Sequence, residues 1–182
     1  MASIFAHAAA GAALWPLFQT ARLPRHVWLT GAVLAMVPDL DVVGFRFGIA
    51  YGDLLGHRGL THSLFFAAAL GALVLEVGYR KRKWPVDRMR LWGYLALATA
   101  SHGVLDALTT GGLGVAFFAP LVSQRYFFPW RPILVSPIGV GAFFSAWGLA
   151  VLKNEALWVG LPAALFAGVV HLLRRPVRDR RA

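Results

Sequence analysis

Five long apolar runs constrain the fold of this chain more than any other feature of its sequence. Each run has sixteen or more residues, and a membrane-spanning helix needs about 17 to 25 apolar residues. A soluble helical core would have to hide all of these runs, although only 14% of the residues are charged and 58% are hydrophobic. We therefore predict an all-α fold, a polytopic transmembrane helix bundle. The runs cover residues 3–18, 64–79, 91–108, 136–152 and 156–173.

Two further apolar stretches are shorter and are expected to form half-helices, re-entrant helices or sheltered short spans. One covers residues 27–37 and ends at Pro38, and the other covers residues 112–122. The bundle is therefore expected to contain roughly five to seven membrane segments. Residues 1–173 form a single membrane-embedded helical domain in this interpretation, and residues 174–182 form a basic C-terminal tail.

The net charge of +10 comes from basic residues that lie directly beside the apolar runs. They cluster in residues 80–83, at Arg88 and Arg90, and in residues 174–181. This placement favours membrane lipids with anionic headgroups as partners and argues against nucleic acid. The chain has no cysteine, which excludes disulfides, thiolate zinc sites and cysteine nucleophiles.

The basic loops also predict the orientation of the bundle, because Lys and Arg accumulate on the cytoplasmic side of a membrane. Arg22, Arg25 and the basic loop of residues 80–90 should therefore be cytoplasmic. The first four helices then alternate in direction. Two simple crossings after the fourth helix would leave the basic tail outside, so either residues 112–122 also cross or a late helix is re-entrant at Pro162.

Four polar motifs interrupt the apolar background. They are His7, PDLD at residues 38–41, HRGLTHS at residues 57–63 and HGVLD at residues 102–106. On the alternating topology, all four fall at one end of the bundle, opposite the basic loop. Ionisable groups within a membrane are costly and mark functional sites, so their convergence indicates a site at that end.

The spacing within two of these motifs suits metal binding. His102 and Asp106 are four residues apart, so on a helix their side chains share a face and can bind one cation. Asp39 and Asp41 are expected to alternate along an extended segment after Pro38. One aspartate could then bind metal while the other orients a histidine or reaches a second ion.

The HRGLTHS motif adds His57 and His62, which bracket a glycine turn at a helix start. Imidazoles and carboxylates without thiols suit zinc, manganese or iron. Arg58, in the same motif, would suit a substrate with an anionic headgroup.

Each motif also has a simpler structural explanation. PDLD could break a helix and cap the next turn, and His7 could be a hydrogen-bond partner in helix packing. His102 and Asp106 could form a buried polar pair between helices. In HRGLTHS, Thr61 could cap the following helix while Arg58 lies among the headgroups. The convergence of all four motifs favours the metal site.

The order of the motifs resembles that of a family of bacterial inner-membrane proteins, the YdjM/YbcI-like family, whose members are assigned as metal-dependent hydrolases. The resemblance spans most of the chain and implies a location in the cell inner membrane. A more distant similarity links the motifs to zinc-dependent phospholipase C and P1-type nucleases. That similarity implies as zinc ligands His7, Asp41, His62, His102 and Asp106. The only histidine after Asp106 is His171, so one or two ions fit better than a trinuclear site.

Together these features predict a membrane-bound, metal-dependent hydrolase acting on a lipid or lipid-linked ester, preferably a phosphoester, at the outer face of the membrane. A divalent cation would polarise a phosphoryl or acyl oxygen and lower the pKa of a bound water towards about 7. Asp39 or Asp41 would act as general base, and Arg58 would bind the substrate. The candidate metal ligands are His7, Asp39, Asp41, His57, His62, His102 and Asp106.

Two other functions remain compatible with the sequence. The histidines and carboxylates could form a metal-ion or proton path in a transporter. Alternatively, the chain could be a non-catalytic membrane scaffold that recruits a cytoplasmic partner through its basic loop and tail.

Overall fold

The computed structural model describes residues 1–20, 23–24, 26–80 and 87–174. Within these residues the chain is helical, with two isolated β-bridges and no strand, which confirms the predicted all-α fold. The helical elements in chain order are α1 (Ile4–Ala13), α2 (Trp15–Phe18), α3 (Val27–Leu34), the 3₁₀ helices η1 (Val37–Phe47) and η2 (Leu60–His62), α4 (Leu64–Tyr79), α5 (Arg88–Ala107), α6 (Val140–Phe143), α7 (Ala146–Glu155), the π-helical turn η3 (Ala156–Gly160) and α8 (Leu161–Leu173).

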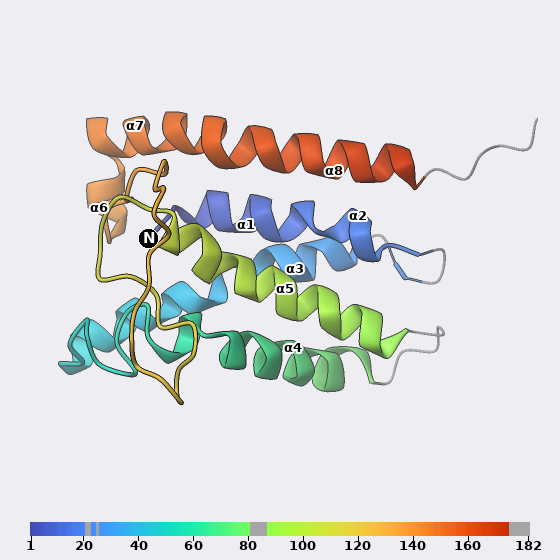
Figure 1. Ribbon diagram of the computed structural model, residues 1–182, viewed down its shortest axis with the longest axis horizontal. Helices are drawn as coiled ribbons and strands as arrows, with labels where there is room; N and C mark the ends of the chain where they lie inside the picture. The colour runs from blue at the N-terminus through green and yellow to red at the C-terminus, as the bar shows by residue number, and fades with distance from the viewer. Residues whose placement is uncertain (21–22, 25, 81–86, 175–182) are drawn as a thin grey trace, which may run out of the picture.

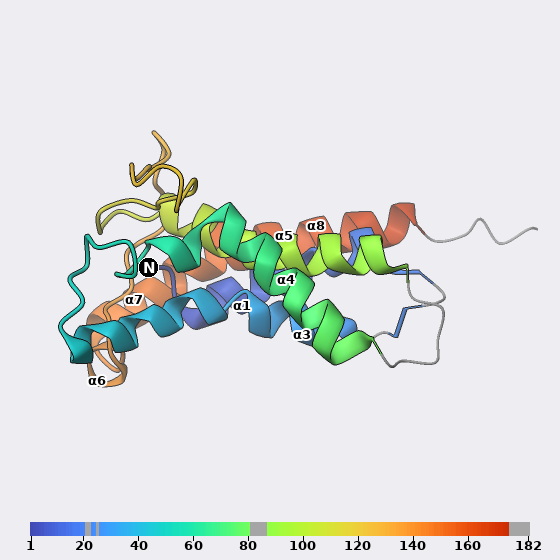
Figure 2. The ribbon, with the colours of Figure 1, turned by 90° about the horizontal axis from the view of Figure 1, so that it is seen from below.

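The long helices lie side by side, and the chain reverses direction between successive ones (Figure 1). Helix α5 is central and packs against α1, α3 and α4, while α7, η3 and α8 form a long outer rod along α1. The N-terminus, α6 and the irregular segments gather at one end, which we name the loop end (Figure 2). The opposite end, where α4 ends and α5 begins, is named the basic end.

The core of the bundle is built around α5, whose apolar positions recur at helical spacing. Leu91, Tyr94 and Ala98 are fully buried there. The ring of Tyr94 fits against Gly31 of α3, where an added Cβ would lie 2.1 Å from the phenol oxygen. The Tyr94 hydroxyl is also 3.2 Å from the carbonyl oxygen of Gly11 on α1. One side chain thus joins three helices.

Two helical stretches in the described part of the chain are long and apolar enough to cross a membrane. Val27–Phe47 has 21 residues, and Ala146–Leu173 has 28 residues with a mean hydropathy of 2.0. The second stretch is almost entirely exposed on the outside of the bundle, as a lipid-facing helix would be. Ile4–Phe18 and Leu64–Tyr79 are apolar but shorter, so the expected number of five to seven membrane segments stays a prediction.

The prediction of two separate late spans, residues 136–152 and 156–173, is wrong. Ala146–Leu173 is one continuous helical stretch, because η3 joins α7 directly to α8. Pro162 follows this wider turn, where its ring and its missing N–H are accommodated without a break, so no re-entrant helix begins there. Arg174 then lies beside Asp87 and Arg90 at the basic end. With one late helix, the predicted alternation no longer leaves Arg174 on the outside; residues 175–182 lie outside the described part of the chain.

Residues 112–122 form no helix, so the alternative that they cross the membrane is also wrong. They belong to an irregular segment, residues 108–139, at the loop end. Two bridges hold this segment, one between Thr109 and Ile133 and one between Val115 and Tyr126. Gly112 and Gly114 have φ angles of 93° and 82°, a conformation that interrupts a helix.

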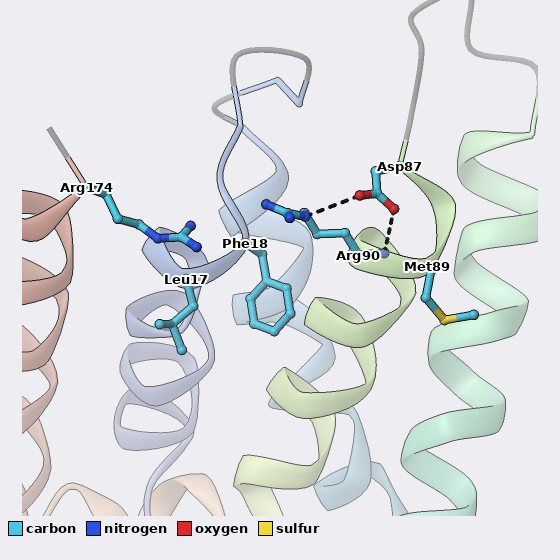
Figure 3. A pocket seen from close by; sticks show the side chains of 6 residues that line it. All are labelled: Leu17, Phe18, Asp87, Met89, Arg90 and Arg174. Carbon is cyan, nitrogen blue, oxygen red and sulfur yellow. Dashed lines mark hydrogen bonds and ion pairs between the residues drawn. The ribbon is translucent and has the colours of Figure 1, made fainter. Parts of the chain in front are cut away.

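A shallow hollow of about 330 Å³ lies at the basic end (Figure 3). Within it, Asp87 caps the start of α5 by accepting a hydrogen bond from the Arg90 N–H, and it also pairs with the Arg90 side chain. The hollow contains none of the predicted site residues, which lie at the opposite end. Its lining residues are Leu17, Phe18, Asp87, Met89, Arg90 and Arg174.

Candidate metal centre

The structure brings all the predicted site residues together inside the loop end of the bundle. Helix α1 contributes one of them, η1 two, the segment around η2 three, and α5 two. None of these side chains is more than 6% exposed. Four motifs that are far apart in the sequence therefore form one buried cluster, made up of His7, Asp39, Asp41, His57, Arg58, His62, His102 and Asp106.

The prediction of an extended PDLD segment is wrong, because these residues lie in the 3₁₀ helix η1. Pro38 occupies the first turn of that helix, where no backbone N–H is needed. A 3₁₀ helix has three residues per turn, so two residues that are two positions apart face different directions. Asp39 accordingly lies 3.3 Å from His102 Nε2, whereas Asp41 lies 2.7 Å from His57 Nδ1.

The clearest sign of a cation site is the pair formed by His62 and His102, whose Nε2 atoms lie 2.9 Å apart. His102 Nδ1 lies 2.7 Å from the carbonyl oxygen of Ala35, so Nδ1 carries the hydrogen and Nε2 keeps a lone pair. His62 Nδ1 lies 3.1 Å from the Thr61 hydroxyl, which already donates its own hydrogen to Asp41, so Nδ1 of His62 also carries the hydrogen. Two lone pairs this close repel each other unless a proton or a metal ion lies between them.

The charges around His62 favour such a cation. Burial by itself lowers the pKa of His62, but the nearby carboxylates of Asp106, Asp39 and Asp41 outweigh burial and raise this pKa to about 10. Carboxylates that hold a proton this strongly also attract a divalent ion, which binds in competition with the proton.

Several other buried polar atoms in the described cluster have no hydrogen-bond partner. An unsatisfied buried polar atom costs about 1 to 3 kcal/mol, so a group of them in one place indicates a common partner. Their imidazole nitrogens and carboxylate oxygens are ligands that suit zinc, manganese or iron. The atoms are both ring nitrogens of His7, both carboxylate oxygens of Asp39, Nε2 of His57 and Oδ2 of Asp106.

The potential ligand atoms form two overlapping groups, and within each group all atoms lie within 4.8 Å of one another. Both groups contain Asp39 and Asp106, so either carboxylate could bind an ion held by either group. His7 stacks on His102 with ring centroids 3.6 Å apart, which places both rings on one side of the cluster. The residues therefore fit one or two divalent ions. One group is His7, Asp39, His102 and Asp106, and the other is Asp39, His57, His62 and Asp106.

Asp41 faces histidines and a hydroxyl in this structure. Its Oδ1 lies 2.7 Å from His57 Nδ1, and its Oδ2 accepts a hydrogen bond of 2.7 Å from the Thr61 hydroxyl. The same oxygen lies 3.2 Å from His62 Nδ1. A carboxylate behind a histidine fixes the ring orientation and leaves the other nitrogen free for metal, so Asp41 is placed to orient His57 and His62.

The simpler explanation of the HRGLTHS turn is wrong in two respects. Ser63, and not Thr61, caps α4 by accepting a hydrogen bond from the Phe66 N–H. Arg58 is fully buried and does not lie among headgroups. Its φ angle of 64° is unfavourable for a residue with a side chain, and strain of this kind is typical of functional sites.

The guanidinium of Arg58 binds groups at the end of α5 and just beyond it. Arg58 Nε lies 2.9 Å from Asp106 Oδ2 as an ion pair, although it is not aligned as a hydrogen bond. Its Nη1 donates to the carbonyl oxygen of Gly111 at 2.8 Å, and its Nη2 donates to the Thr109 hydroxyl at 2.9 Å. Arg58 therefore offsets part of the negative charge of the cluster.

The sequence analysis did not single out Ala2, Ser3 or Glu155, which lie next to the cluster. The Ala2 N–H donates to Asp106 Oδ1 at 2.7 Å, and Ser3 binds the buried carboxylate of Glu155. The only signal in the sequence for these residues was Glu155, an acidic residue at the junction of two apolar runs. Glu155 resembles a loop residue if the two runs are taken as separate helices.

A helical bundle with an exposed apolar outer helix and a buried histidine–carboxylate cluster defines a membrane protein with a candidate metal centre. The chain belongs to the YdjM inner membrane protein family, whose model matches residues 1–177. It is also 37% identical over 176 residues to the inner membrane protein YbcI of Escherichia coli (strain K12), a match that covers 96% of this chain and 100% of the relative. No solved structure matches the chain. The predicted family and the membrane location are confirmed.

Proposed function

We propose that this membrane protein is a metal-dependent hydrolase that cleaves a lipid or lipid-linked phosphoester at the outer face of the inner membrane. The observation that carries the proposal is the facing pair of Nε2 atoms of His62 and His102, 2.9 Å apart. Buried carboxylate oxygens without hydrogen-bond partners lie beside this pair. A divalent ion would satisfy both, and hydrolytic sites commonly hold such ions with imidazole and carboxylate ligands.

The proposal assigns one or two ions, preferably zinc, with manganese or iron as alternatives. A divalent ion bound there would act as a Lewis acid on a phosphoryl oxygen and lower the pKa of a water molecule towards about 7. Asp39 and Asp106 would each offer one oxygen as a ligand, because both belong to the two overlapping ligand groups. The remaining ligands would be His7, His57, His62 and His102.

Asp39 is a better candidate for the general base than Asp41. Neither oxygen of Asp39 has a hydrogen-bond partner, so one could accept a proton from the attacking water. The oxygens of Asp41 are already engaged by His57 and Thr61. Arg58, beside Asp106, would stabilise the negative charge that develops on a phosphoryl group.

The surface of the loop end supports a lipid-like substrate. Phe47 at the end of η1 is 79% exposed, and Leu121 in the irregular segment is 92% exposed. Leu54 and Leu55, in the loop between η1 and η2, are also exposed. Apolar side chains of this size, gathered at one end of a membrane protein, suit contact with acyl chains. A substrate with acyl chains could then approach the cluster from the bilayer.

The orientation follows from the basic end. If the basic end is cytoplasmic, as Arg80, Arg88 and Arg174 favour, the cluster faces the outer side of the membrane. Five crossings then suffice, made by α1, α3 with η1, α4, α5, and the α7–α8 rod. Arg80, Arg88 and Arg174 share the cytoplasmic side in this arrangement.

A second candidate function, metal-ion transport, is supported by the complete burial of the ligands, since ions bound within a bundle are typical of transporters. The position of the cluster argues against it. The half of the core nearer the basic end is apolar around Leu91, Tyr94 and Leu95, and no second set of potential ligands occurs there within the described residues. A path through the bundle would need one.

The test is metal analysis of the purified protein combined with hydrolysis and uptake assays. We expect one or two equivalents of zinc, manganese or iron in the wild type and loss of that metal in the H102A and D106A variants. Phosphate or headgroup release from a panel of phospholipids in mixed micelles should be lost with the metal. Glu76→Ala is the control, because Glu76 is exposed at the other end and pairs with Arg80 and Arg88.

Each function predicts a different outcome. Wild-type protein without stoichiometric metal would overturn the metal site and favour the scaffold. Bound metal with cation uptake into proteoliposomes, and without hydrolysis of any lipid in the panel, would favour the transporter.

A further inference from the structure

Glu155 is an unusual residue for its position in the fold. It ends α7 within the long stretch Ala146–Leu173, which is mainly apolar and mostly exposed on the outside of the bundle. The Glu155 side chain is only 4% exposed. A buried carboxylate inside a membrane is costly unless hydrogen bonds satisfy it, so its partners indicate what it does.

Both oxygens of Glu155 bind Ser3. The Ser3 N–H donates to one oxygen at 2.5 Å, and the Ser3 hydroxyl donates to the other at 2.5 Å. Ser3 is also the N-cap of α1 and accepts a hydrogen bond from the Ala6 N–H. We name this arrangement the Ser3–Glu155 clamp. It fixes the start of the helix that carries His7 against the outer rod.

The clamp continues to the metal centre through Ala2. The Ala2 N–H donates to Asp106 Oδ1 at 2.7 Å, and Ala2 itself is fully buried. The other oxygen of the same carboxylate, Oδ2, lies 2.9 Å from Arg58 Nε and 3.5 Å from His62 Nε2. The hydrogen bond from Ala2 therefore fixes which oxygen of Asp106 faces His62.

The helix geometry around Glu155 supports a dedicated role. The π-helical turn η3 begins at the next residue, Ala156, and single π-turns within α-helices occur frequently at functional sites. The preceding residue, Asn154, accepts a hydrogen bond from the Leu134 N–H at 2.8 Å and donates one to the Pro132 carbonyl oxygen at 3.0 Å. Two consecutive polar residues thus attach the outer rod to the loop end.

We infer that Glu155 is a positioning residue for the metal centre, which acts through Ser3 and Ala2 to hold Asp106 and α1 in their metal-binding arrangement. This inference rests on the proposed function. Glu155 belongs to neither ligand group, so it sets metal affinity without binding the ion. The C-terminal rod is thereby coupled to a site to which it contributes no ligand.

The test measures zinc affinity of the full-length protein in detergent by competition with a chelator. Glu155→Ala removes the acceptor for both Ser3 bonds and should weaken binding about 10- to 100-fold, as is typical when a supporting contact of a metal site is lost. Glu155→Gln keeps an oxygen for the Ser3 N–H in a side chain of the same size, and it should bind zinc within a few-fold of the wild type. A larger loss in E155Q would mean that the charge of Glu155, and not the clamp, is what matters, and would overturn the inference.

Ser3→Ala provides a second, milder variant, because the backbone N–H of residue 3 can still donate to Glu155. It should weaken zinc binding, and the S3A/E155A double variant should be no weaker than E155A, because both act through one clamp. Glu76→Ala is the matched control and should bind zinc as the wild type does.

Two outcomes separate this inference from the proposed function. Wild-type zinc binding that S3A and E155A leave unchanged, even if their melting temperatures fall, would overturn the clamp and leave the metal site intact. Wild-type protein that binds no zinc would overturn both.

Discussion

At the residue scale, the two aspartates of one short motif have separate tasks. Asp39 faces His102 and has no hydrogen-bond partner for either oxygen. Asp41 binds His57 and Thr61. This difference arises from the three-residue turn of η1. The sequence predicted that one aspartate binds metal while the other orients a histidine, but not which of the two does so.

The different roles of Asp39 and Asp41 can be tested with two matched substitutions. Asp39→Asn should abolish binding of at least one ion, because it removes a charged ligand that both ligand groups share. Asp41→Asn keeps an acceptor for His57 or Thr61 and should retain the ions with affinity weakened about 10- to 100-fold. Elemental analysis gives the number of ions, and chelator competition gives the affinity. Equal losses in the two variants would contradict the division of tasks.

At the element scale, periodicity located helices well but not their ends or their continuity. The predicted run at residues 64–79 is α4, and the predicted helix carrying His102 and Asp106 is α5. The predicted alternation of helix direction was enough to place the four motifs at one end of the bundle. It could not reveal that α7 and α8 form one rod, since the polar residues Lys153, Asn154 and Glu155 resemble a loop. Their partners, Leu134, Pro132 and Ser3, are distant in sequence.

Close helix packing in the core gives a stability prediction. Gly31→Ala should destabilise the bundle by about 1 to 3 kcal/mol through overpacking, because the new Cβ would lie 2.1 Å from the Tyr94 phenol oxygen and 2.3 Å from its Cζ. Gly78→Ala in α4 is the matched control. That position is exposed with open space around it, so alanine should stabilise the helix by about 0.5 to 1 kcal/mol. Thermal unfolding in detergent would measure both, and a G31A variant as stable as the wild type would show that α3 does not pack against Tyr94 in this way.

At the scale of the whole molecule, the buried histidine–carboxylate cluster and the arginines of the basic end lie at opposite ends of the bundle. The buried cluster lies at the loop end, whereas Arg80, Arg88, Arg90 and Arg174 lie at the basic end. The last two predicted spans are one rod. The chain therefore runs along the bundle an odd number of times between the N-terminus and Arg174 (Figure 1). The N-terminus and Arg174 therefore lie at opposite ends of the bundle.

This topology predicts which positions can be labelled from each side of the membrane. The chain has no cysteine, so single cysteines can be introduced without a background. Ser123→Cys at the loop end should react with a membrane-impermeant maleimide in intact spheroplasts, because Ser123 is an exposed polar residue of the irregular segment. Met89→Cys and Arg174→Cys should react only after the membrane is opened, since both line the hollow at the basic end. Labelling of Met89→Cys and Arg174→Cys from opposite sides would contradict the single late helix. Labelling of all three from the same side would contradict the placement of the metal centre at the outer face.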